Sequence, residues 1–162
     1  MLLHLVNKRG VEMNKSKTRL AVGAVIMQSN EVLLVHKVKV MTEGEENDKV
    51  KGTWDFPKGG VEESDVNLEE ALLGELEEET GSKAYKIIRR YNETIDFKFP
   101  KGYKYASQKT IMYHVIYTGD RSDIKAKDEE IDDIKFVEYR EVLNSLELEE
   151  TKSFFVKCTE LK

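Results

Sequence analysis

Three glutamates at helical spacing are the residues of this chain best suited to chemistry. Glu75, Glu78 and Glu79 stand at positions i, i+3 and i+4, so in a helix they project from one face. Like charges at this spacing repel one another and destabilise an isolated helix. We therefore expect a partner that neutralises them. Because the ligands are oxygens with no histidine or cysteine nearby, the partner they suit is a hard cation, Mg²⁺ or Mn²⁺.

The element that must position these carboxylates is a helix predicted from about Asn67 to Thr80. Asn67 is a suitable N-cap, and Gly81 is suited to end the helix in the left-handed conformation. The three glutamates border an apolar arc, so they are expected at the rim of a cleft, partly removed from water. The predicted arc, which would pack on a sheet, consists of Leu68, Leu72, Leu73 and Leu76.

Length and composition describe a globular chain with a single domain. The 162 residues are 40% hydrophobic and 35% charged, and the net charge of −5 argues against non-specific coating of duplex DNA. No apolar run reaches a membrane-spanning length. The single cysteine, Cys158, cannot form an internal disulfide, which favours a reducing cytoplasm. Regular patterning starts near Thr18, so we predict a loose extension over 1–17 and one domain over 18–162.

Hydrophobic periodicity predicts a mixed sheet flanked by helices, an α+β arrangement. The segment 18–28 is apolar on both alternating faces, as in a strand covered on both sides, and Ser29-Asn30 indicates a hairpin into the next strand. Polar residues predict loops over 41–53 and 119–133. The remaining predicted elements are strands over 31–38, 83–99, 103–118 and 134–139, with closing helices over 140–148 and 151–161.

The run WDFPKGGVEE at 54–63, followed by LEEALLGELEEETG at 68–81, resembles the signature of the Nudix hydrolases, G-x5-E-x7-R-E-U-x-E-E-x-G-U. Glu75-Leu76 corresponds to E-U, Glu78-Glu79 to E-E, and Gly81 to the final glycine. The strands before and after this segment also fit, so the resemblance extends from residue 18 to about 148. It implies a Nudix-like α/β/α sandwich with a mixed sheet between helices.

Three positions depart from that signature. Gly74 replaces the arginine that normally helps to hold the carboxylates, and Ser82 replaces the last aliphatic residue. The first glutamate of the signature falls at Asp65 or Val66, of which only Asp65 could act like it. A glycine inside a helix also costs about 1 kcal/mol relative to alanine. These departures bear on catalytic efficiency more than on the fold.

The resemblance implies hydrolysis of a diphosphate linked to another group, with Mg²⁺ or Mn²⁺ as the cofactor. In that scheme Glu75 and Glu79 are the principal metal ligands, Glu78 is a ligand or the base, and the backbone at Gly59 and Gly60 completes the metal or phosphate shell. The catalytic candidates are therefore Glu75 and Glu78.

A further metal-ligating carboxylate is expected from the acidic segment 128–133, which lies where many family members supply one. Glu130 is favoured, followed by Glu129. A solvated charged loop is an equally good interpretation of either residue.

Candidate substrate-binding residues combine cations for a polyphosphate with aromatic faces for a base. The lysines can also be interpreted as protecting the edges of a hairpin, and core packing is the favoured interpretation of Trp54. The candidates are Lys58, Trp54, Lys101, Lys104 and Tyr113.

The segment WDFPKGG at 54–60 resembles the branch of the family that cleaves dinucleoside polyphosphates or removes pyrophosphate from RNA 5′ ends. The resemblance therefore implies a pyrophosphohydrolase that acts on a nucleotide or polyphosphate, either a dinucleoside polyphosphate or an RNA 5′-triphosphate end. Two alternatives stay open at this point: a Nudix-fold nucleotide-binding module with impaired catalysis, and a hydrolase that removes oxidised dNTPs. The sequence is compatible with a monomer or a homodimer, and it indicates neither duplex DNA nor a membrane as a partner.

Overall fold

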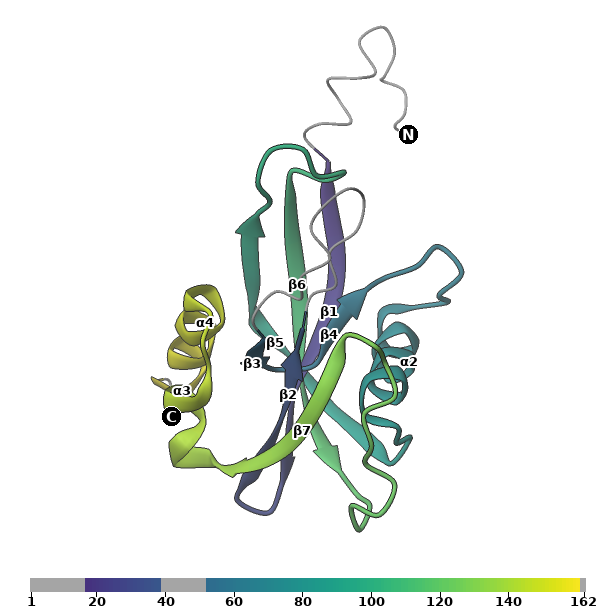
Figure 1. Ribbon diagram of the computed structural model, residues 1–162, viewed down its shortest axis with the longest axis vertical. Helices are drawn as coiled ribbons and strands as arrows, with labels where there is room; N and C mark the ends of the chain where they lie inside the picture. Colours follow the sequence, from purple (N-terminus) through teal and green to yellow (C-terminus); the bar gives the residue numbers. More distant parts are fainter. Residues whose placement is uncertain (1–16, 39–51, 161–162) are drawn as a thin grey trace, which may run out of the picture.

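A mixed sheet of seven strands forms the centre of the computed structural model, which describes residues 17–38 and 52–160 (Figure 1). Its main path runs in the order β3-β2-β1-β6-β5, with β4 added beside β1 and β7 beside β2. The β1–β6 pair is parallel and the other pairs are antiparallel. The strands are β1 (Thr18–Gln28), β2 (Glu31–Lys37), β3 (Thr53–Asp55), β4 (Lys58–Gly60), β5 (Tyr85–Lys98), β6 (Ser107–Tyr117) and β7 (Ile131–Glu138).

Helices cover both faces of this sheet. The helix α2 (Leu68–Thr80) lies on one face, and α3 (Val142–Ser145) and α4 (Glu149–Glu160) lie on the other (Figure 1). This confirms the predicted α/β/α sandwich. None of the helices in the described ranges is long and apolar enough to cross a membrane.

The central strand β1 contributes to two core layers, as its apolar alternation predicts. Val22, Ala24 and Ile26 belong to the layer beneath α2, whereas Val25 belongs to the layer beneath α4. All four side chains are at most 2% exposed. Burial on both sides fixes the register of the strand, because a slip of one residue would exchange its two faces.

The caps of α2 are those that the sequence predicts. Asn67 Oδ1 accepts a hydrogen bond of 2.8 Å from the Glu70 amide, and Gly81 ends the helix at φ 85°. The predicted apolar arc is wrong at one position, because Leu73 is 38% exposed and Ala71 packs in the core instead. The core stripe of this short helix is therefore narrower than its leucines indicate.

Several predicted elements differ from the structure, and the strand predicted from residue 103 begins only at Ser107. A helix over 140–148 is wrong: the chain forms a 3₁₀ turn at Tyr139–Glu141 and the single turn α3, after which Leu146 turns extended and is buried. The last strand begins at Ile131, three residues earlier than predicted. The strands β3 and β4 were not predicted, since each has only three residues and Pro57 lies between them. The predicted extension and most of the predicted 41–53 loop lie outside the described residues.

Candidate active site

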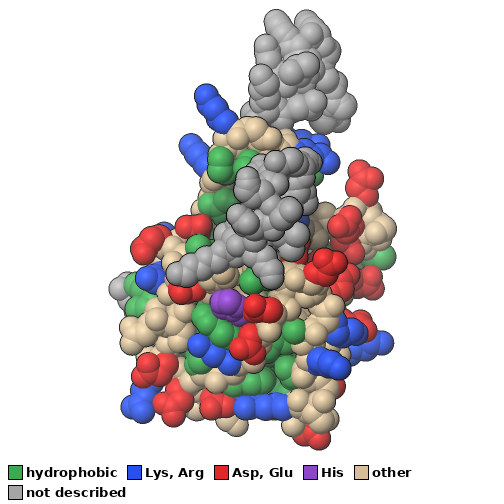
Figure 2. Space-filling view, viewed as in Figure 1, with side chains coloured by type: hydrophobic (Ala, Val, Ile, Leu, Met, Phe, Trp, Pro, Cys, Tyr) green, Lys and Arg blue, Asp and Glu red, His purple; other side chains and the backbone are tan. Residues whose placement is uncertain are grey.

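A cavity of about 600 Å³ lies where the glutamate face of α2 meets β4 and the loop before β7. Acidic side chains also gather on the surface over the segment that leads into α2, at the upper right of Figure 2. We call this cavity the carboxylate cleft. Its acidic lining residues are Asp55, Glu62, Glu75, Glu78, Glu79, Asp128, Glu130 and Glu150, and its basic lining residues are Arg19, Lys37 and Lys58.

Close approach of two elements requires glycine at one wall of the cleft. Gly59 in β4 pairs with Val22 of β1, and a Cβ atom at Gly59 would overlap the carboxylate of Glu75. Only a residue without a side chain allows α2 to bring Glu75 against this strand. The glycine is therefore needed to place the Glu75 carboxylate beside the backbone of β4.

Glu79 is the most unusual group in the cleft. Its side chain is almost fully buried, and among the described residues its Oε1 atom has no hydrogen-bond partner. Its other oxygen lies 3.5 Å from Lys37 Nζ, at the end of β2. An unpaired buried carboxylate oxygen costs free energy, so its presence points to a ligand that is not part of the chain.

Glu75 and Glu79 both hold their protons more tightly than a free glutamate. Burial, followed by the neighbouring charges of Glu79 and Glu78, raises the pKa of Glu75 to about 7. Burial likewise raises the pKa of Glu79 to about 7, although the Lys37 ammonium opposes that shift. Asp128 adds to the raised pKa of both groups, so the loop before β7 acts electrostatically on the helix.

The donor set fits a hard divalent cation. Among the described residues, no three acidic, histidine or cysteine side chains already converge as a closed metal cluster. The unpaired Glu79 oxygen, the half-buried Glu75 and the exposed Glu78 are nevertheless all oxygen donors on one helix face. A cation between them would replace the missing partner of Glu79 and relieve the repulsion that raises the pKa of Glu75.

The part of the cleft lining that β3 and β4 contribute carries a buried ion pair. Lys58 Nζ lies 2.9 Å from Asp55 Oδ2 and donates to Thr151 Oγ1 at 3.4 Å. Asp55 Oδ1 also accepts the Phe56 amide at 2.8 Å. Each charged group on this wall therefore has a partner within the chain.

The cleft extends away from α2 toward an aromatic end. Arg19 of β1 donates to Gln108 Oε1 of β6 at 2.5 Å, and both residues line the cleft. Phe97 and Phe99 line it as well, with their rings edge-to-face at 5.0 Å. This end offers a guanidinium, an amide and two aromatic rings, whereas the α2 end offers carboxylates.

The structure places the predicted site residues in two groups. Six of them line the carboxylate cleft: Glu75, Glu78, Glu79, Glu130, Gly59 and Lys58. Four do not line it: Trp54, Lys101, Lys104 and Tyr113. Glu129, the second choice in the acidic loop, does not line it either, whereas its neighbour Asp128 does.

The four residues outside the cleft have other surroundings. Trp54 packs against His36, with ring centroids 4.8 Å apart, and Lys135 Nζ lies 4.1 Å from the Trp54 ring centre. Tyr113 is buried in the core beneath α2, and Lys101 and Lys104 are exposed in the β5–β6 loop. Their geometry gives no support to a role in substrate binding.

The three departures from the family signature have separate local explanations. Asp65 accepts the Glu62 amide in a turn and does not line the cleft. Ser82 is buried and donates to Asp123 at 2.7 Å, which ties the end of α2 to the 119–126 loop. Gly74 is exposed, and a Cβ atom there would meet nothing within 4 Å. None of the three distorts the carboxylate face.

Sequence reasoning missed several residues that line the cleft. Lys37 could have been predicted as a site residue, because it is a charged side chain at the end of an otherwise apolar strand. Arg19, Phe97 and Gln108 gave no such signal, since they come together only through the pairing of β1, β5 and β6. Asp55 lines the cleft, although only its neighbour Trp54 was predicted as a site residue.

Comparison with known proteins gives a family and several relatives. A family model described as the NUDIX domain matches residues 17–157. An RNA pyrophosphohydrolase from a Nitratiruptor species is 31% identical over 139 residues, which cover 82% of this chain and 85% of that protein. An RNA pyrophosphohydrolase from Helicobacter pylori is 28% identical over 141 residues, covering 80% of this chain and 84% of its own length.

Solved structures share the fold at lower identity. A MutT protein from Methanosarcina mazei Go1 superposes with a TM-score of 0.67 at 21% identity, covering 90% of this chain and 96% of that one. An Ap4A hydrolase from C. elegans gives a TM-score of 0.65 at 18% identity, covering 89% and 97%. At these identities the likeness concerns the fold.

Proposed function

The chain belongs to the Nudix family, as a hydrolase of phosphoanhydride bonds, and we propose that its substrate is an RNA 5′-triphosphate end, cleaved with Mg²⁺ or Mn²⁺ bound in the carboxylate cleft. The observation that carries the metal-dependent part of this proposal is the buried Oε1 atom of Glu79, which has no hydrogen-bond partner among the described residues. The relative from Nitratiruptor, 31% identical over most of both chains, supports RNA as the substrate.

The proposed metal ligands are Glu75, Glu78 and Glu79 on α2, with Glu130 from the loop before β7 and the backbone of Gly59. When bound, the cation neutralises phosphate charge and lowers the pKa of a coordinated water. Burial holds the Glu79 side chain in place, and Glu75 is held against Gly59 of β4.

The proton of the attacking water goes to a glutamate at the rim of the cleft. Glu78 is exposed and stands one turn from Glu75 on the same face of α2. A carboxylate near solvent can take a proton and release it to bulk water between turnovers. We assign this role to Glu78, while Glu75 orients the reacting group.

The aromatic end of the cleft accommodates the first base of the RNA. Phe97 and Phe99 offer ring faces and edges for stacking, a mode of binding that tolerates any base. Arg19 lies at the same end and supplies a positive charge for the triphosphate or the first linkage. Lys37, between Glu79 and the Lys58 carbonyl, is placed to meet a phosphate near the metal.

The direct experiment uses RNA that carries a labelled 5′-triphosphate, incubated with the full chain and Mg²⁺ or Mn²⁺. We expect 5′-monophosphate RNA and release of the β- and γ-phosphates, as pyrophosphate or as two phosphates. Diadenosine tetraphosphate, ADP-ribose, dNTPs and oxidised dNTPs serve as parallel substrates. If only one of these substrates is hydrolysed and the RNA is recovered intact, RNA is refuted as the substrate, but the assignment of the chain as a hydrolase stands.

A binding module with lost catalysis is a second candidate, because Gly74 stands where the family has arginine and Asp65 is engaged in a turn. Gly74→Arg separates the two candidates, since the position is open enough to accept the side chain. A decayed enzyme would gain activity from near zero. Wild-type turnover that Glu79→Gln abolishes would exclude the binding module.

A further inference from the structure

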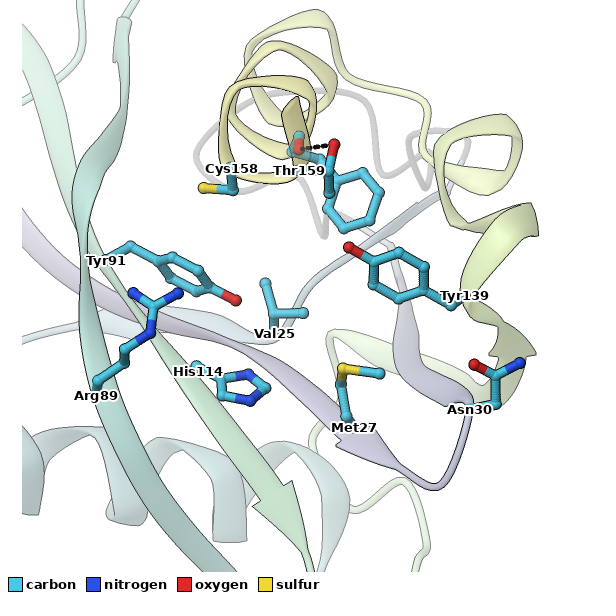
Figure 3. Close-up of a pocket in the computed structure, with 10 residues that line it drawn as sticks. Val25, Met27, Asn30, Arg89, Tyr91, His114, Tyr139, Cys158 and Thr159 are labelled. Atoms are coloured by element: carbon cyan, nitrogen blue, oxygen red, sulfur yellow. Dashed lines mark hydrogen bonds between the residues drawn. The ribbon is translucent and has the colours of Figure 1, made fainter. Parts of the chain in front are cut away.

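A second cavity, of about 370 Å³, lies on the α4 side of the sheet, beside the last residues of that helix (Figure 3). Its walls come from β1, β5, β6, the turn after β7 and α4. In Figure 3, Arg89, Tyr91 and His114 stand on one side of the opening and Tyr139 on the other. We call this space the aromatic cavity. Its ring-bearing lining residues are Tyr91, His114, Tyr139 and Phe155.

The aromatic cavity is separate from the carboxylate cleft. Arg19, near the start of β1, lines the cleft, whereas Met27, near its end, lines the cavity. The two sites share no described lining residue, although Lys58 of the cleft pairs with Gly23, two positions from Val25 of the cavity. The helix α4 runs between them, because Glu150 near its start lines the cleft and Thr159 near its end lines the cavity.

The two sites differ in charge. Ten of the described residues line the aromatic cavity, and none of them is aspartate or glutamate, although the chain carries a net charge of −5. Glu93 accepts a hydrogen bond from Cys158 Sγ at 3.7 Å but does not line the cavity. An anion can therefore enter without a metal ion, whereas in the cleft it meets eight carboxyl groups.

Arg89 provides the positive charge. Its guanidinium carbon lies 4.7 Å from the centre of the Tyr91 ring, and no described carboxylate lies within ion-pair distance of it. Stacking on a ring holds the guanidinium plane while leaving its N–H groups available as donors. Burial raises the pKa of Tyr91 to about 12, so its phenol stays protonated as a further donor. The Arg89 guanidinium presents several N–H donors in one plane, an arrangement that suits a phosphate.

Rings on several elements frame the rest of the cavity. Tyr139 packs on Phe155 with centroids 5.5 Å apart, and Tyr91 meets His114 edge-on at 6.3 Å. Flat side chains on facing walls, with the aliphatic Val25 and Met27 at the floor, match the shape of a planar heterocycle. The volume is near the lower end of the range for small-molecule sites, which admits one nucleotide but not an oligonucleotide.

We propose that the aromatic cavity is a metal-independent binding site for a nucleoside monophosphate, with the phosphate on Arg89 and the base between the rings of Tyr139 and Tyr91. This proposal does not depend on the hydrolase substrate, because it uses no residue of the carboxylate cleft. It assigns a ligand to residues that the reaction leaves unused.

The test is a titration of the ¹⁵N-labelled full chain with AMP, GMP, CMP and UMP in the presence of a chelator. We expect saturable shifts of the amides of Val25, Met27, His114 and Thr159, while those of Gly59 and Glu75 stay in place. The chelator removes metal-dependent binding in the cleft, so the position of the shifted amides identifies the site.

Arg89→Gln and Arg90→Gln form a matched pair of variants. Both arginines are exposed on β5, but Arg89 pairs with His114 and Arg90 with Tyr113, so they lie on opposite faces of the sheet. Loss of a charge-assisted contact predicts that Arg89→Gln weakens AMP binding about tenfold or more. Arg90→Gln should stay within about twofold of the wild-type affinity.

Inorganic phosphate and adenosine are titrated separately. Phosphate tests the part of the site at Arg89, and adenosine tests the part between the rings of Tyr91 and Tyr139. Each is expected to bind more weakly than AMP. The proposal is overturned by equal affinity of the Arg89→Gln and Arg90→Gln variants, by shifts confined to the carboxylate cleft, or by adenosine that binds as tightly as AMP. The absence of saturable shifts up to about 5 mM nucleotide would overturn it as well.

Discussion

The two walls of the carboxylate cleft treat buried charge in opposite ways. On the β3–β4 wall, Asp55 and Lys58 lie 2.9 Å apart, and the further hydrogen bonds of both groups are made within the chain. On the α2 wall, Glu79 is just as buried, but one of its oxygens has no partner among the described residues. We call the β3–β4 wall closed, because its two charged groups pair with each other. We call the α2 wall open, because a buried carboxylate oxygen there has no partner among the described residues.

This difference indicates that one wall has a structural role and the other a chemical role. In a closed buried pair the mutual attraction offsets much of the desolvation cost, and removal of one partner is strongly destabilising because it leaves the other charge unpaired. An open buried carboxylate carries a desolvation cost at all times, and the chain tolerates it because an external cation can offset it. We infer that the α2 wall binds the metal and that the Asp55–Lys58 wall gives the cleft its shape.

The largest expected effect is on the open wall. Glu79→Gln preserves the size of the side chain but removes the charge, so we expect hydrolysis of the preferred substrate to fall about 1,000-fold. Steady-state rates with saturating Mg²⁺ measure this loss. Glu77→Gln, on the same helix with its carboxylate 3.9 Å from Lys83, is the matched control and should stay within about twofold. Equal losses in both variants would contradict the assignment.

The closed wall should respond in stability instead. Lys58→Met leaves Asp55 buried without its counterion and is expected to lower the free energy of unfolding by about 3 kcal/mol. Chemical denaturation of the metal-free chain measures the change. The double variant Asp55→Asn with Lys58→Met should recover most of the loss, because no unpaired charge remains. If Lys58→Met unfolds like the wild type but loses phosphate binding, Lys58 acts on the substrate.

A pH titration of stability distinguishes the walls without altering either. The pKa values of Glu75 and Glu79, raised to about 7 from 4.5, mean that the folded chain holds more protons than the unfolded chain between these values. Metal-free stability should therefore fall as pH rises from about 4.5 to 7. The expected fall is about 2 kcal/mol, since solvent screens the half-buried Glu75. Thermal denaturation in chelator measures this.

The same titration on Glu79→Gln supplies its control. Glutamine carries no charge at any pH, so the variant should lose part of the fall and be more stable than the wild type at about pH 8 without metal. Saturating Mg²⁺ should flatten the wild-type profile in a similar way. A metal-free wild type whose stability rises through this pH window would show that the glutamates are already paired.

The smallest effect concerns the helix that carries the open wall. Gly74 is exposed and a Cβ atom there meets nothing, so Gly74→Ala should stabilise the chain by about 1 kcal/mol, raising the melting temperature by about 2–4 °C. Activity should change little, because alanine supplies no group to the carboxylates. A large gain in activity would mean that the rigidity of α2 limits metal binding.

Local patterns predicted the parts of the site that lie on one element. The spacing of Glu75, Glu78 and Glu79 gave their common helix face, and Asn67 and Gly81 gave its ends. Gly59 was predicted to contribute its backbone to the site, and it does line the cleft, where a Cβ atom would overlap the carboxylate of Glu75. The burial of β1 on both sides of the sheet could also be predicted, since both faces of the strand are apolar.

Features that depend on strand pairing were not predictable in this way. Arg19 meets Gln108 only because β1 and β6 are parallel in one register, and the residues are 89 positions apart. Tyr113 is a predicted substrate-binding residue, but its place in the β6 alternation directs it to the core beneath α2. The burial of Lys58 depends on its ion pair with Asp55, which only the pairing of β3 with β2 and of β4 with β1 brings into the cleft.

The most direct test of the central claim is calorimetric titration of the full chain with Mn²⁺ and Mg²⁺, with and without a non-hydrolysable nucleotide. We predict saturable uptake by the wild type and by Glu77→Gln, and affinity at least about tenfold weaker for Glu79→Gln. Protons should be released on binding near pH 7, because Glu75 and Glu79 must ionise. Uptake that is unchanged in Glu79→Gln, or no uptake by the wild type, would contradict the account.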